Sequence, residues 1–322
     1  MPLTNILVLS NPAAPHLKVL AKLPDTAVLT VTADAALAIE KAADADIIFN
    51  AQFNADMLKQ VFPAAKKVRW VHSITAGVDH VLFPELRASD IPLTNGRGAF
   101  ARSLGEWAIA GAMFFAKHMR QMRAAQLAGK WAQFDIEELH GTTMGIVGYG
   151  EIGRAVAERA KAFGMRVIAV RRRPELSTKD PLLDAIYAPD QLLEFIHECD
   201  YVVAAAPNTP ATKGMIGAEA IAAMKPTAVV INVGRGPVID EPALLAALQE
   251  HRIRGAALDV FNQEPLPEGH PFYALDNVLM SYHSADHVGG WIENAVDVFV
   301  RNYDHLSKGE PLENVVDKEA GY

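Results

Sequence analysis

Short apolar runs alternate with longer segments of helical composition along most of the chain. The runs rich in Val, Ile and Leu predict strands at Ile6–Leu9, Val28–Val31, Asp46–Phe49, Val68–His72, Thr143–Val147, Val167–Val170, Tyr201–Ala205, Ala228–Asn232, Gly255–Leu258 and Asn277–Met280. The Ala/Leu/Glu-rich segments predict helices at Ala35–Ala43, Ile152–Ala162, Pro189–His197 and Glu241–Glu250. This alternation is typical of βα units around parallel sheets. The nearly continuous apolar strands indicate that helices cover both faces of each sheet.

Two segments mark where one sheet ends and another begins. Ser103–Arg120 predicts a long helix with apolar residues on several sides, which favours burial between domains or subunits. Gly289–Gly290 precedes an amphipathic helix predicted over Trp291–Leu306. We therefore predict an α/β protein with two Rossmann-like, doubly wound parallel-sheet domains: a first domain over 1–103, a second over 104–288, and a tail over 289–322 that returns to the first.

Composition narrows the class of partner. The 322 residues are 50% hydrophobic, and a net charge of -8 without a long basic stretch argues against nucleic acid or an anionic membrane as a partner. Cys199 is the only cysteine, which excludes an intramolecular disulfide and favours a reducing, cytoplasmic location. The N-terminus lacks the pattern of a secretory signal, and no stretch approaches ~20 apolar residues. Small molecules are the expected partners.

A glycine-rich turn lies between a predicted strand and a predicted helix. Gly148, Gly150 and Gly153 form the pattern G-Y-G-E-I-G. In a dinucleotide site the first glycine permits the tight turn, the second lets the backbone approach a pyrophosphate, and the third lets the helix pack on the strand. An ordinary glycine turn is the alternative. The strand–turn–helix context favours a dinucleotide site, in which the helix start at Glu151 and Ile152 faces the phosphates.

Arginines stand where the second strand of this βα unit ends. A site for NAD is expected to carry an acidic residue there to bind the ribose 2′-hydroxyl. This chain has Arg171, Arg172 and Arg173, which would attract a 2′-phosphate through charge-assisted hydrogen bonds. A solvated basic turn is the alternative. We predict that the cofactor is NADP(H) by preference, with NAD(H) as a possible second cofactor.

Three polar residues follow three later strands: Arg235, Glu264 and His283. The carboxyl ends of parallel strands surround the ligand crevice of an open sheet, so these residues can converge there. The arginine can grip a carboxylate, the histidine can pass a proton near neutral pH, and the glutamate can favour the charged histidine. Each also has a structural interpretation, as a turn arginine, an exposed glutamate or a core histidine. Their joint placement favours catalysis.

The chain resembles the D-isomer-specific 2-hydroxyacid dehydrogenase family along essentially its whole length. The motifs that carry the resemblance are the run Val71–Asp79 ending in A-G-V-D, G-I-V-G-Y-G-E-I-G from Gly145, N-V-G-R-G from Asn232, D-V-F-x-x-E-P-L from Asp259, and the late His283. The resemblance implies a substrate domain divided between the two termini, a cofactor domain between them, catalysis in the cleft, and a homodimer packed through the long helix. It also implies hydride transfer between the cofactor and a small 2-oxo or 2-hydroxy acid, with D stereochemistry.

The resemblance also carries roles to individual residues. Arg235 matches the substrate-binding arginine, Glu264 the partner of the histidine, and His283 the proton donor. The cofactor-binding residues that it implies, beyond the glycine turn, are Pro207, Thr212, Val233, Gly234, Asp259, Ala285 and Asp286. Backbone N–H groups of Ala76, Gly77 and Val78 are expected to complete a cradle for the substrate carboxylate, since glycine permits conformations that aim successive amides at one anion.

The sequence departs from the family pattern around the histidine, and this leaves the substrate open. Tyr282 stands where proline is frequent, and Ser284–His287 replaces a glycine-containing stretch. Glyoxylate, hydroxypyruvate, ketopantoate and bulkier 2-oxo acids all fit the same chemistry. A cofactor-sensing binding protein without significant turnover is the alternative function, and a related enzyme acting on formate is disfavoured because formate oxidation does not require the His–Glu pair.

Other polar and aromatic residues have simpler interpretations. His283 and His287 are four residues apart but lack a third ligand, so no metal site is predicted. The aromatic residues Phe53, Trp131 and Trp291 could wall a substrate pocket together with His287, although large aromatics more often belong to a core or an interface. Cys199 is expected to be a small buried hydrophobic residue.

Overall fold

The computed structural model describes residues 3–322, and the chain divides into two compact units. Unit 1 comprises the chain up to Phe100 together with Val288–Tyr322, and unit 2 comprises Ala101–His287. The boundaries predicted at 103/104 and 288/289 therefore lie three residues and one residue beyond those of the structure. Within residues 3–322, no helix combines the length and the apolar character needed to span a membrane.

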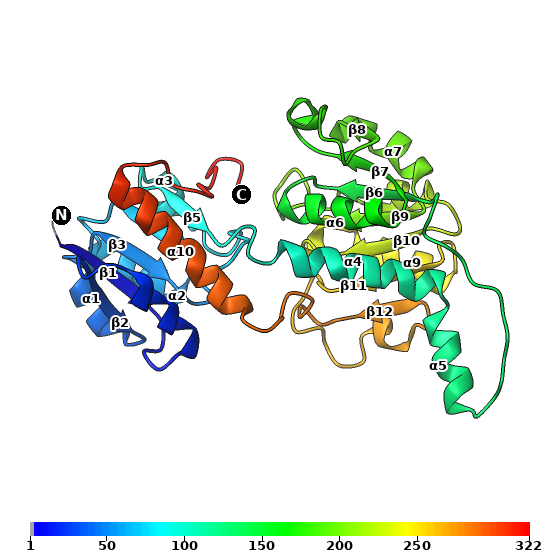
Figure 1. Cartoon of the computed structure of the whole chain (residues 1–322), viewed down its shortest axis with the longest axis horizontal. Coiled ribbons are helices and arrows are strands. Elements are labelled where there is room, and N and C mark those ends of the chain that lie inside the picture. The colour runs from blue at the N-terminus through cyan, green and yellow to red at the C-terminus, as the bar shows by residue number, and fades with distance from the viewer. Residues whose placement is uncertain (1–2) are drawn as a thin grey trace. The chain divides into compact units, whose positions relative to one another are not determined.

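Unit 1 is built on a parallel sheet of five strands, counted over its described residues, in the order β2-β1-β3-β4-β5 (Figure 1). The strands are β1 (Thr4–Leu9), β2 (Ala27–Thr32), β3 (Ile47–Asn50), β4 (Trp70–Ser73) and β5 (Leu93–Asn95). The helices are α1 (Ala35–Ala42), α2 (Asp56–Val61), α3 (Pro84–Ala88) and α10 (Trp291–Lys308), with 3₁₀ turns at Pro15–Lys22 and Phe62–Ala64.

Alternate residues of the unit 1 strands face two different layers. Ile48 and Val71 belong to a buried cluster with residues of α1, α2 and α3. The next residues along the strands face α10, where the ring of Phe299 stacks on those of Phe49 and Trp70 at centroid distances of 4.4 and 5.0 Å. Strands that are buried on both faces need apolar residues at nearly every position, which is the pattern that predicted them.

Unit 2 holds a parallel sheet of seven strands, counted between Ala101 and His287, in the order β12-β11-β10-β9-β6-β7-β8. The strands are β6 (Thr143–Val147), β7 (Arg166–Val170), β8 (Ala185–Tyr187), β9 (Tyr201–Ala204), β10 (Val229–Asn232), β11 (Gly255–Leu258) and β12 (Val278–Met280). The helices are α4 (Ala101–Ala116), α5 (Met119–Leu127), α6 (Glu151–Ala162), α7 (Leu192–Glu198), α8 (Ala218–Ala222) and α9 (Glu241–Gln249).

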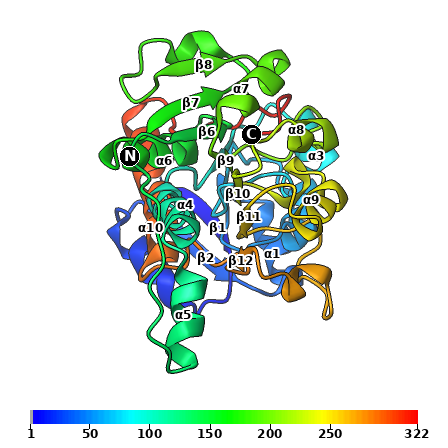
Figure 2. The ribbon, with the colours of Figure 1, turned by 90° about the vertical axis from the view of Figure 1, so that its right-hand side faces the viewer.

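Helices cover both faces of this second sheet, as predicted. Figure 2 shows α4 and α6 on one side and α8 and α9 on the other. Helix α4 lies very close to its neighbours: a Cβ on Gly105 would be 2.9 Å from the backbone of Ala155 in α6, and one on Gly111 would be 2.9 Å from Cβ of Ala257 in β11. The two parallel α/β sheets confirm the predicted fold class.

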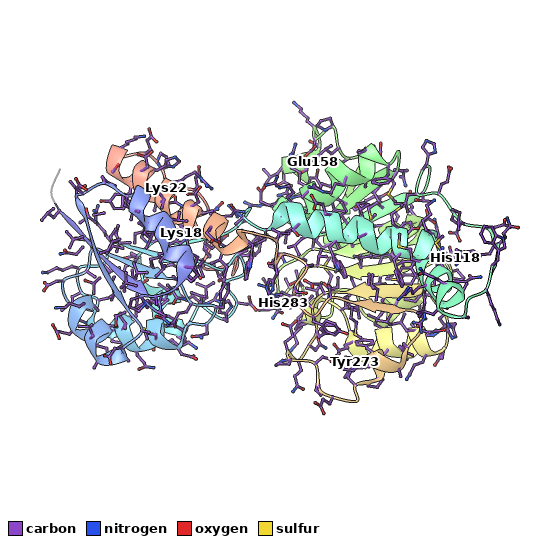
Figure 3. The ribbon with its side chains drawn as sticks, turned by 60° about the horizontal axis from the view of Figure 1, so that its bottom comes forward. Lys18, Lys22, His118, Glu158, Tyr273 and His283 are labelled. Carbon is purple, nitrogen blue, oxygen red and sulfur yellow. The ribbon has the colours of Figure 1, made fainter. Side chains whose placement is uncertain are left out.

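The long helix predicted over Ser103–Arg120 is wrong at its C-terminal end. Helix α4 stops at Ala116, and His118 adopts a left-handed conformation with φ of 49° before α5 begins at Met119. Arg254 holds this break, because its Nη2 donates to the carbonyl of Phe115 at 2.8 Å. The left-handed residue changes the direction of the chain, so α5 projects from unit 2 as an arm with His118 at its base (Figures 1 and 3).

Candidate active site

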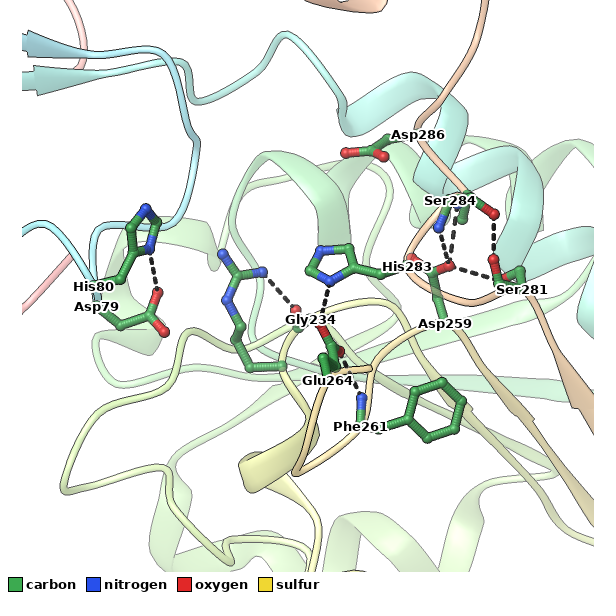
Figure 4. A network of polar contacts seen from close by, with 12 residues as sticks. Asp79, His80, Gly234, Asp259, Phe261, Glu264, Ser281, His283, Ser284 and Asp286 are labelled. Atoms are coloured by element: carbon green, nitrogen blue, oxygen red, sulfur yellow. Dashed lines mark hydrogen bonds and ion pairs between the residues drawn. The ribbon is translucent and has the colours of Figure 1, made fainter. Parts of the chain in front are cut away.

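Three neighbouring strands of unit 2 deliver the predicted catalytic residues to one edge of the sheet. Strands β10, β11 and β12 pair in parallel, so the chain leaves each of them at the same edge. Arg235 follows β10, Glu264 follows β11 and His283 follows β12. The close view in Figure 4 shows His283 directly beside Glu264. The structure therefore brings together polar groups that lie far apart in the sequence.

His283 and Glu264 form a short hydrogen-bonded pair. Nδ1 of His283 lies 2.6 Å from Oε2 of Glu264, and the other carboxylate oxygen accepts a 2.8 Å hydrogen bond from the N–H of Phe261. The bond to Glu264 raises the pKa of His283 above its ordinary value, although burial and the positive charge of Arg235 oppose the rise. Burial raises the pKa of Glu264, but the bonds from His283 and Phe261 outweigh it and leave this pKa lowered. The pair therefore favours a carboxylate beside an imidazolium.

Asp259 holds the turn that carries His283. Its Oδ1 accepts hydrogen bonds from Oγ of Ser281 at 2.6 Å and from the N–H groups of Ser284 and Ala285 at 2.9 and 3.1 Å. Its carbonyl accepts from the N–H of His283 at 2.5 Å. Tyr282 and His283 both have left-handed backbone conformations, with φ of 55° and 53°. Such conformations are unfavourable for these residues and persist only where the surroundings hold them.

Arg235 lies in a turn that hydrogen bonds hold at the end of β10, at the same edge of the sheet. Its Nη1 donates to the carbonyl of Gly234 at 2.9 Å. The buried side chain of Asn232 accepts from the N–H of Gly234 at 3.1 Å and donates to the carbonyl of Arg235 at 3.1 Å. A Cβ on Gly236 would come within 2.1 Å of the Phe261 carbonyl group, so the turn lies directly on the loop that bears Glu264. The sequence prediction assigned no role to Asn232, whose position at a strand end in N-V-G-R-G was the available signal.

The glycine turn has the local geometry that a dinucleotide needs. Gly148 has φ of 96°, and a Cβ there would lie 2.5 Å from the N–H of Ala206. A Cβ on Gly153 would lie 2.5 Å from the carbonyl oxygen of Gly148, which explains the close approach of α6 to the turn. Space within 4 Å of a Cβ on Gly150 is open among the described residues, and no side chain caps α6 there. These residues fit a bound pyrophosphate, with Glu151 and Ile152 in the first turn of the helix.

The other predicted cofactor residues lie in loops at the same edge of the sheet. Arg171 and Arg172 directly follow β7, which pairs with β6. The segment from Pro207 to Thr212 follows β9 and is closed by the Thr212 hydroxyl, which accepts from the N–H of Thr209 at 2.9 Å and donates to the carbonyl of Pro207. Val233 and Gly234 follow β10, and Ala285 and Asp286 lie beyond His283. Burial raises the pKa of Asp286.

The predicted carboxylate cradle belongs to unit 1, where it follows β4. Oγ1 of Thr75 donates to the carbonyl of Gly77 at 2.8 Å, and Nδ2 of Asn95 donates to the carbonyl of Ala76 at 2.6 Å. The buried Val78 starts the next turn, because its carbonyl accepts from the N–H groups of Val81 and Leu82.

The simpler interpretations of the remaining residues can be compared with the structure. Among residues 3–322, no three His, Cys, Asp or Glu side chains gather as a metal site would require. Trp291 packs against Phe53 and Phe100 within unit 1, and Trp131 is 92% exposed beyond α5. Cys199 is fully buried, with Sγ 3.1 Å from the carbonyl of Phe195, as expected for a small hydrophobic residue.

Comparisons with known proteins agree with this fold. The family profile described as "D-isomer specific 2-hydroxyacid dehydrogenase, NAD binding domain" matches residues 109–285. A glyoxylate reductase from Pyrococcus furiosus is 33% identical over 290 residues, covering 87% of this chain and 85% of the relative. A D-3-phosphoglycerate dehydrogenase from Methanocaldococcus jannaschii is 32% identical over 280 residues, covering 86% of this chain but 53% of the relative, so the chain spans about half the length of that relative.

A solved structure is similar over the whole length of the chain. The NADPH-dependent glyoxylate/hydroxypyruvate reductase from Sinorhizobium meliloti, in complex with NADP and sulfate, has a TM-score of 0.84 and 26% sequence identity, covering 99% of this chain and 100% of its own. The family profile spans more than half of the chain, and the Pyrococcus relative covers most of it. The chain belongs to the D-isomer specific 2-hydroxyacid dehydrogenase family.

Proposed function

We propose that this protein is an NADPH-preferring reductase that converts a small 2-oxo acid to the D-2-hydroxy acid. The observation that carries the proposal is the 2.6 Å contact between His283 and Glu264, in a loop cluster that also bears Arg235. A carboxylate that favours the protonated histidine suits a proton donor, which a protein that only bound the cofactor would not require. Membership of the family supports oxidoreduction of a 2-oxo acid and does not favour the cofactor-sensing alternative.

His283 is the proton donor of the proposed reaction. Glu264 stabilises the imidazolium through Nδ1, which leaves Nε2–H to donate to the substrate carbonyl oxygen. A bound nicotinamide cofactor supplies the hydride for the carbonyl carbon. Arg235 binds the substrate carboxylate and draws electron density from the adjacent carbonyl group, and its charge also limits how far the pKa of His283 rises. In the reverse direction, the neutral imidazole accepts the proton of the hydroxyl group.

The rest of the site follows from the same proposal. The N–H groups of Ala76, Gly77 and Val78 contribute to carboxylate binding. Asp259 holds the His283 turn and would contact the nicotinamide carboxamide of a bound cofactor, and Val233, Gly234, Ala285 and Asp286 would also contact the cofactor. The glycine turn takes the pyrophosphate, and Pro207 and Thr212 line the cofactor on the side of β9.

NADP preference is proposed from the arginines that follow β7. Arg171 and Arg172 replace the acidic residue that a ribose 2′-hydroxyl would require, and the similar Sinorhizobium enzyme is NADPH-dependent and binds NADP. NAD(H) can still occupy the glycine turn, since the pyrophosphate contacts do not involve the 2′ position. The substrate is proposed to be small, of the glyoxylate or hydroxypyruvate type, after the names of the relatives.

A homodimer in the cytoplasm completes the proposal. The arm formed by α5 and the segment after it exposes Met122, Leu127, Trp131 and Ile136. Exposed apolar side chains gathered on one projecting segment are typical of a protein interface. A reducing compartment suits the single buried Cys199.

Steady-state kinetics test the proposed function. The purified protein is assayed with NADPH and with NADH against glyoxylate, hydroxypyruvate, ketopantoate and a bulkier 2-oxo acid, and the product of hydroxypyruvate is analysed by chiral chromatography. We expect turnover with a small acid, higher kcat/KM with NADPH, and D-glycerate as the product. Tight NADPH binding without turnover of any acid would instead support the cofactor-sensing function.

A further inference from the structure

The arginine segment after β7 is held by its own short turn. The segment continues from Arg171 into a 3₁₀ turn at Pro174–Ser177. The guanidinium group of Arg171 donates to the Ser177 hydroxyl, and Ser177 is only 6% exposed. Since Ser177 is buried, its position fixes one end of the hydrogen bond. The orientation of Arg171 therefore depends on where this 3₁₀ turn is anchored.

Asp180 anchors the turn to the glycine-rich loop. Its N–H donates to the carbonyl of Ser177 at 3.1 Å. Its Oδ2 accepts a 3.0 Å hydrogen bond from the hydroxyl of Tyr149 and lies 3.5 Å from Nε of Arg154, while its Oδ1 accepts from the N–H of Leu182 at 3.1 Å. Both carboxylate oxygens are thus engaged within the chain. The anchor joins two segments that both belong to the expected cofactor site.

Tyr149 is the second residue of G-Y-G-E-I-G, and the dinucleotide pattern itself does not require a tyrosine there. The residue is 5% exposed, so its ring is buried. Burial, and then the hydrogen bond to Asp180, raise the pKa of Tyr149 well above its ordinary value, so the hydroxyl stays protonated and donates. A buried hydroxyl must find a partner, and this one finds it in the segment that follows the arginines.

We infer that the Tyr149–Asp180 contact is a clamp that positions the Arg171 segment over the glycine turn and thereby sets the preference for a 2′-phosphate. This inference rests on the proposed NADP preference and names positioning residues for it. A pyrophosphate bound at the glycine turn needs no help from the clamp. A 2′-phosphate does, because an arginine contributes a strong paired contact only when its planar group is held in place. Loosening the clamp should therefore weaken NADPH binding and spare NADH binding.

Two conservative variants test the clamp. Tyr149→Phe keeps the buried ring and removes only the hydroxyl, and Asp180→Asn keeps the size of the side chain and removes its charge. We expect each to raise the Kd of NADPH about 5- to 20-fold, around the lower end of what a charge-assisted hydrogen bond contributes. The Kd of NADH should change by less than about twofold. Both are measured by calorimetric titration of the intact protein, with adenosine 2′-monophosphate as a probe of the phosphate contact alone.

The double variant and a matched control separate the clamp from general damage to the fold. Combining the two substitutions should cost no more NADPH affinity than the stronger single one, because both break the same contact. Tyr187→Phe is the control, since it removes the hydroxyl of another tyrosine, at the end of β8, that bonds a carboxylate, that of Glu198 in α7. We expect it to leave the ratio of the two Kd values unchanged.

The outcomes distinguish the clamp from the cofactor proposal. If the unmodified protein prefers NADPH and both variants keep that preference, the clamp is refuted and the cofactor proposal stands. If the unmodified protein binds NADPH and NADH equally, both ideas are refuted. A parallel loss of affinity for both cofactors would show a structural role only, which also refutes the clamp.

Discussion

Replacing Glu264 by glutamine tests whether the glutamate keeps His283 charged. The two oxygens of Glu264 accept from different donors, His283 Nδ1 and the N–H of Phe261. A glutamine has one acceptor oxygen and one NH₂ donor, so it cannot accept both bonds. If its oxygen keeps the Phe261 N–H, its NH₂ group faces Nδ1 and favours the neutral imidazole. Glu264→Gln should therefore lower the pKa of His283.

The expected loss follows from the exposure of the pair. A hydrogen bond to a charged group contributes roughly 1.5–3 kcal/mol when well shielded. The side chains of His283 and Glu264 are 45% and 33% exposed, so solvent screens the pair and about half of that range applies. This corresponds to a fall in turnover of about 3- to 12-fold, at about 1.4 kcal/mol per factor of ten. His283→Ala removes the proton donor itself and should cost more, about 10²- to 10⁴-fold, while cofactor affinity stays within a few-fold.

The pH dependence separates this effect from a loss of folding. Reduction needs the protonated histidine, so turnover falls as the pH rises through the pKa of His283. Lowering that pKa moves the falling limb to lower pH, so the loss in the variant grows as the pH rises and is smallest at the acidic end of the range. The assay is kcat for reduction of a 2-oxo acid across this range, with Glu268→Gln, an exposed carboxylate of the same loop, as the control. A loss that is uniform with pH would refute the reasoning.

Three further expectations concern the substrate, the cofactor and the core of unit 1. Arg235→Lys keeps a positive charge but loses the planar group that pairs with a carboxylate. The KM of the 2-oxo acid should therefore rise about 10- to 100-fold, while the Kd of NADPH stays nearly constant. An unchanged KM would show that Arg235 does not bind the substrate carboxylate. Arg171→Asp should lower the NADPH-to-NADH ratio of kcat/KM by about tenfold or more, and the ratio of the unmodified protein should shrink as salt rises. Burial lowers the pKa of His72 from its ordinary value of about 6.5 to about 3, so its contribution to stability is present above pH 6.5 and is lost as the pH falls. In urea unfolding, the free energy of unfolding should fall by about 2 kcal/mol between pH 8 and pH 5 because of this group, and His72→Asn should lack that part of the pH dependence. If the free energies of unfolding of the two proteins depended equally on pH, the assignment to His72 would be wrong.

Strands that are buried on both faces could be predicted from the sequence alone. Thr143–Val147 and Gly255–Leu258 have the predicted bounds, because helices on both sides of the sheet demand an unbroken apolar run. The sequence prediction missed β5 (Leu93–Asn95) and β8 (Ala185–Tyr187), which are only three residues long. The equally short β12 was predicted from its apolar run V-L-M, whereas β5 and β8 contain no run of Val, Ile or Leu and are defined by their pairing with β4 and β7.

The sequence by itself determined which residues stand at the ends of strands. The glycine turn, Arg171, Arg235, Glu264 and His283 could be chosen because each lies in the segment that follows a predicted buried strand, and these segments lie at a predictable edge of the sheet. Only the tertiary structure decided how these residues meet. The contacts of Glu264 with His283, of Asp259 with Ser281 and of Tyr149 with Asp180 join residues 19, 22 and 31 positions apart. Local patterns cannot specify such contacts, because strand pairing and the loop conformations between the strands set the distance between the two side chains.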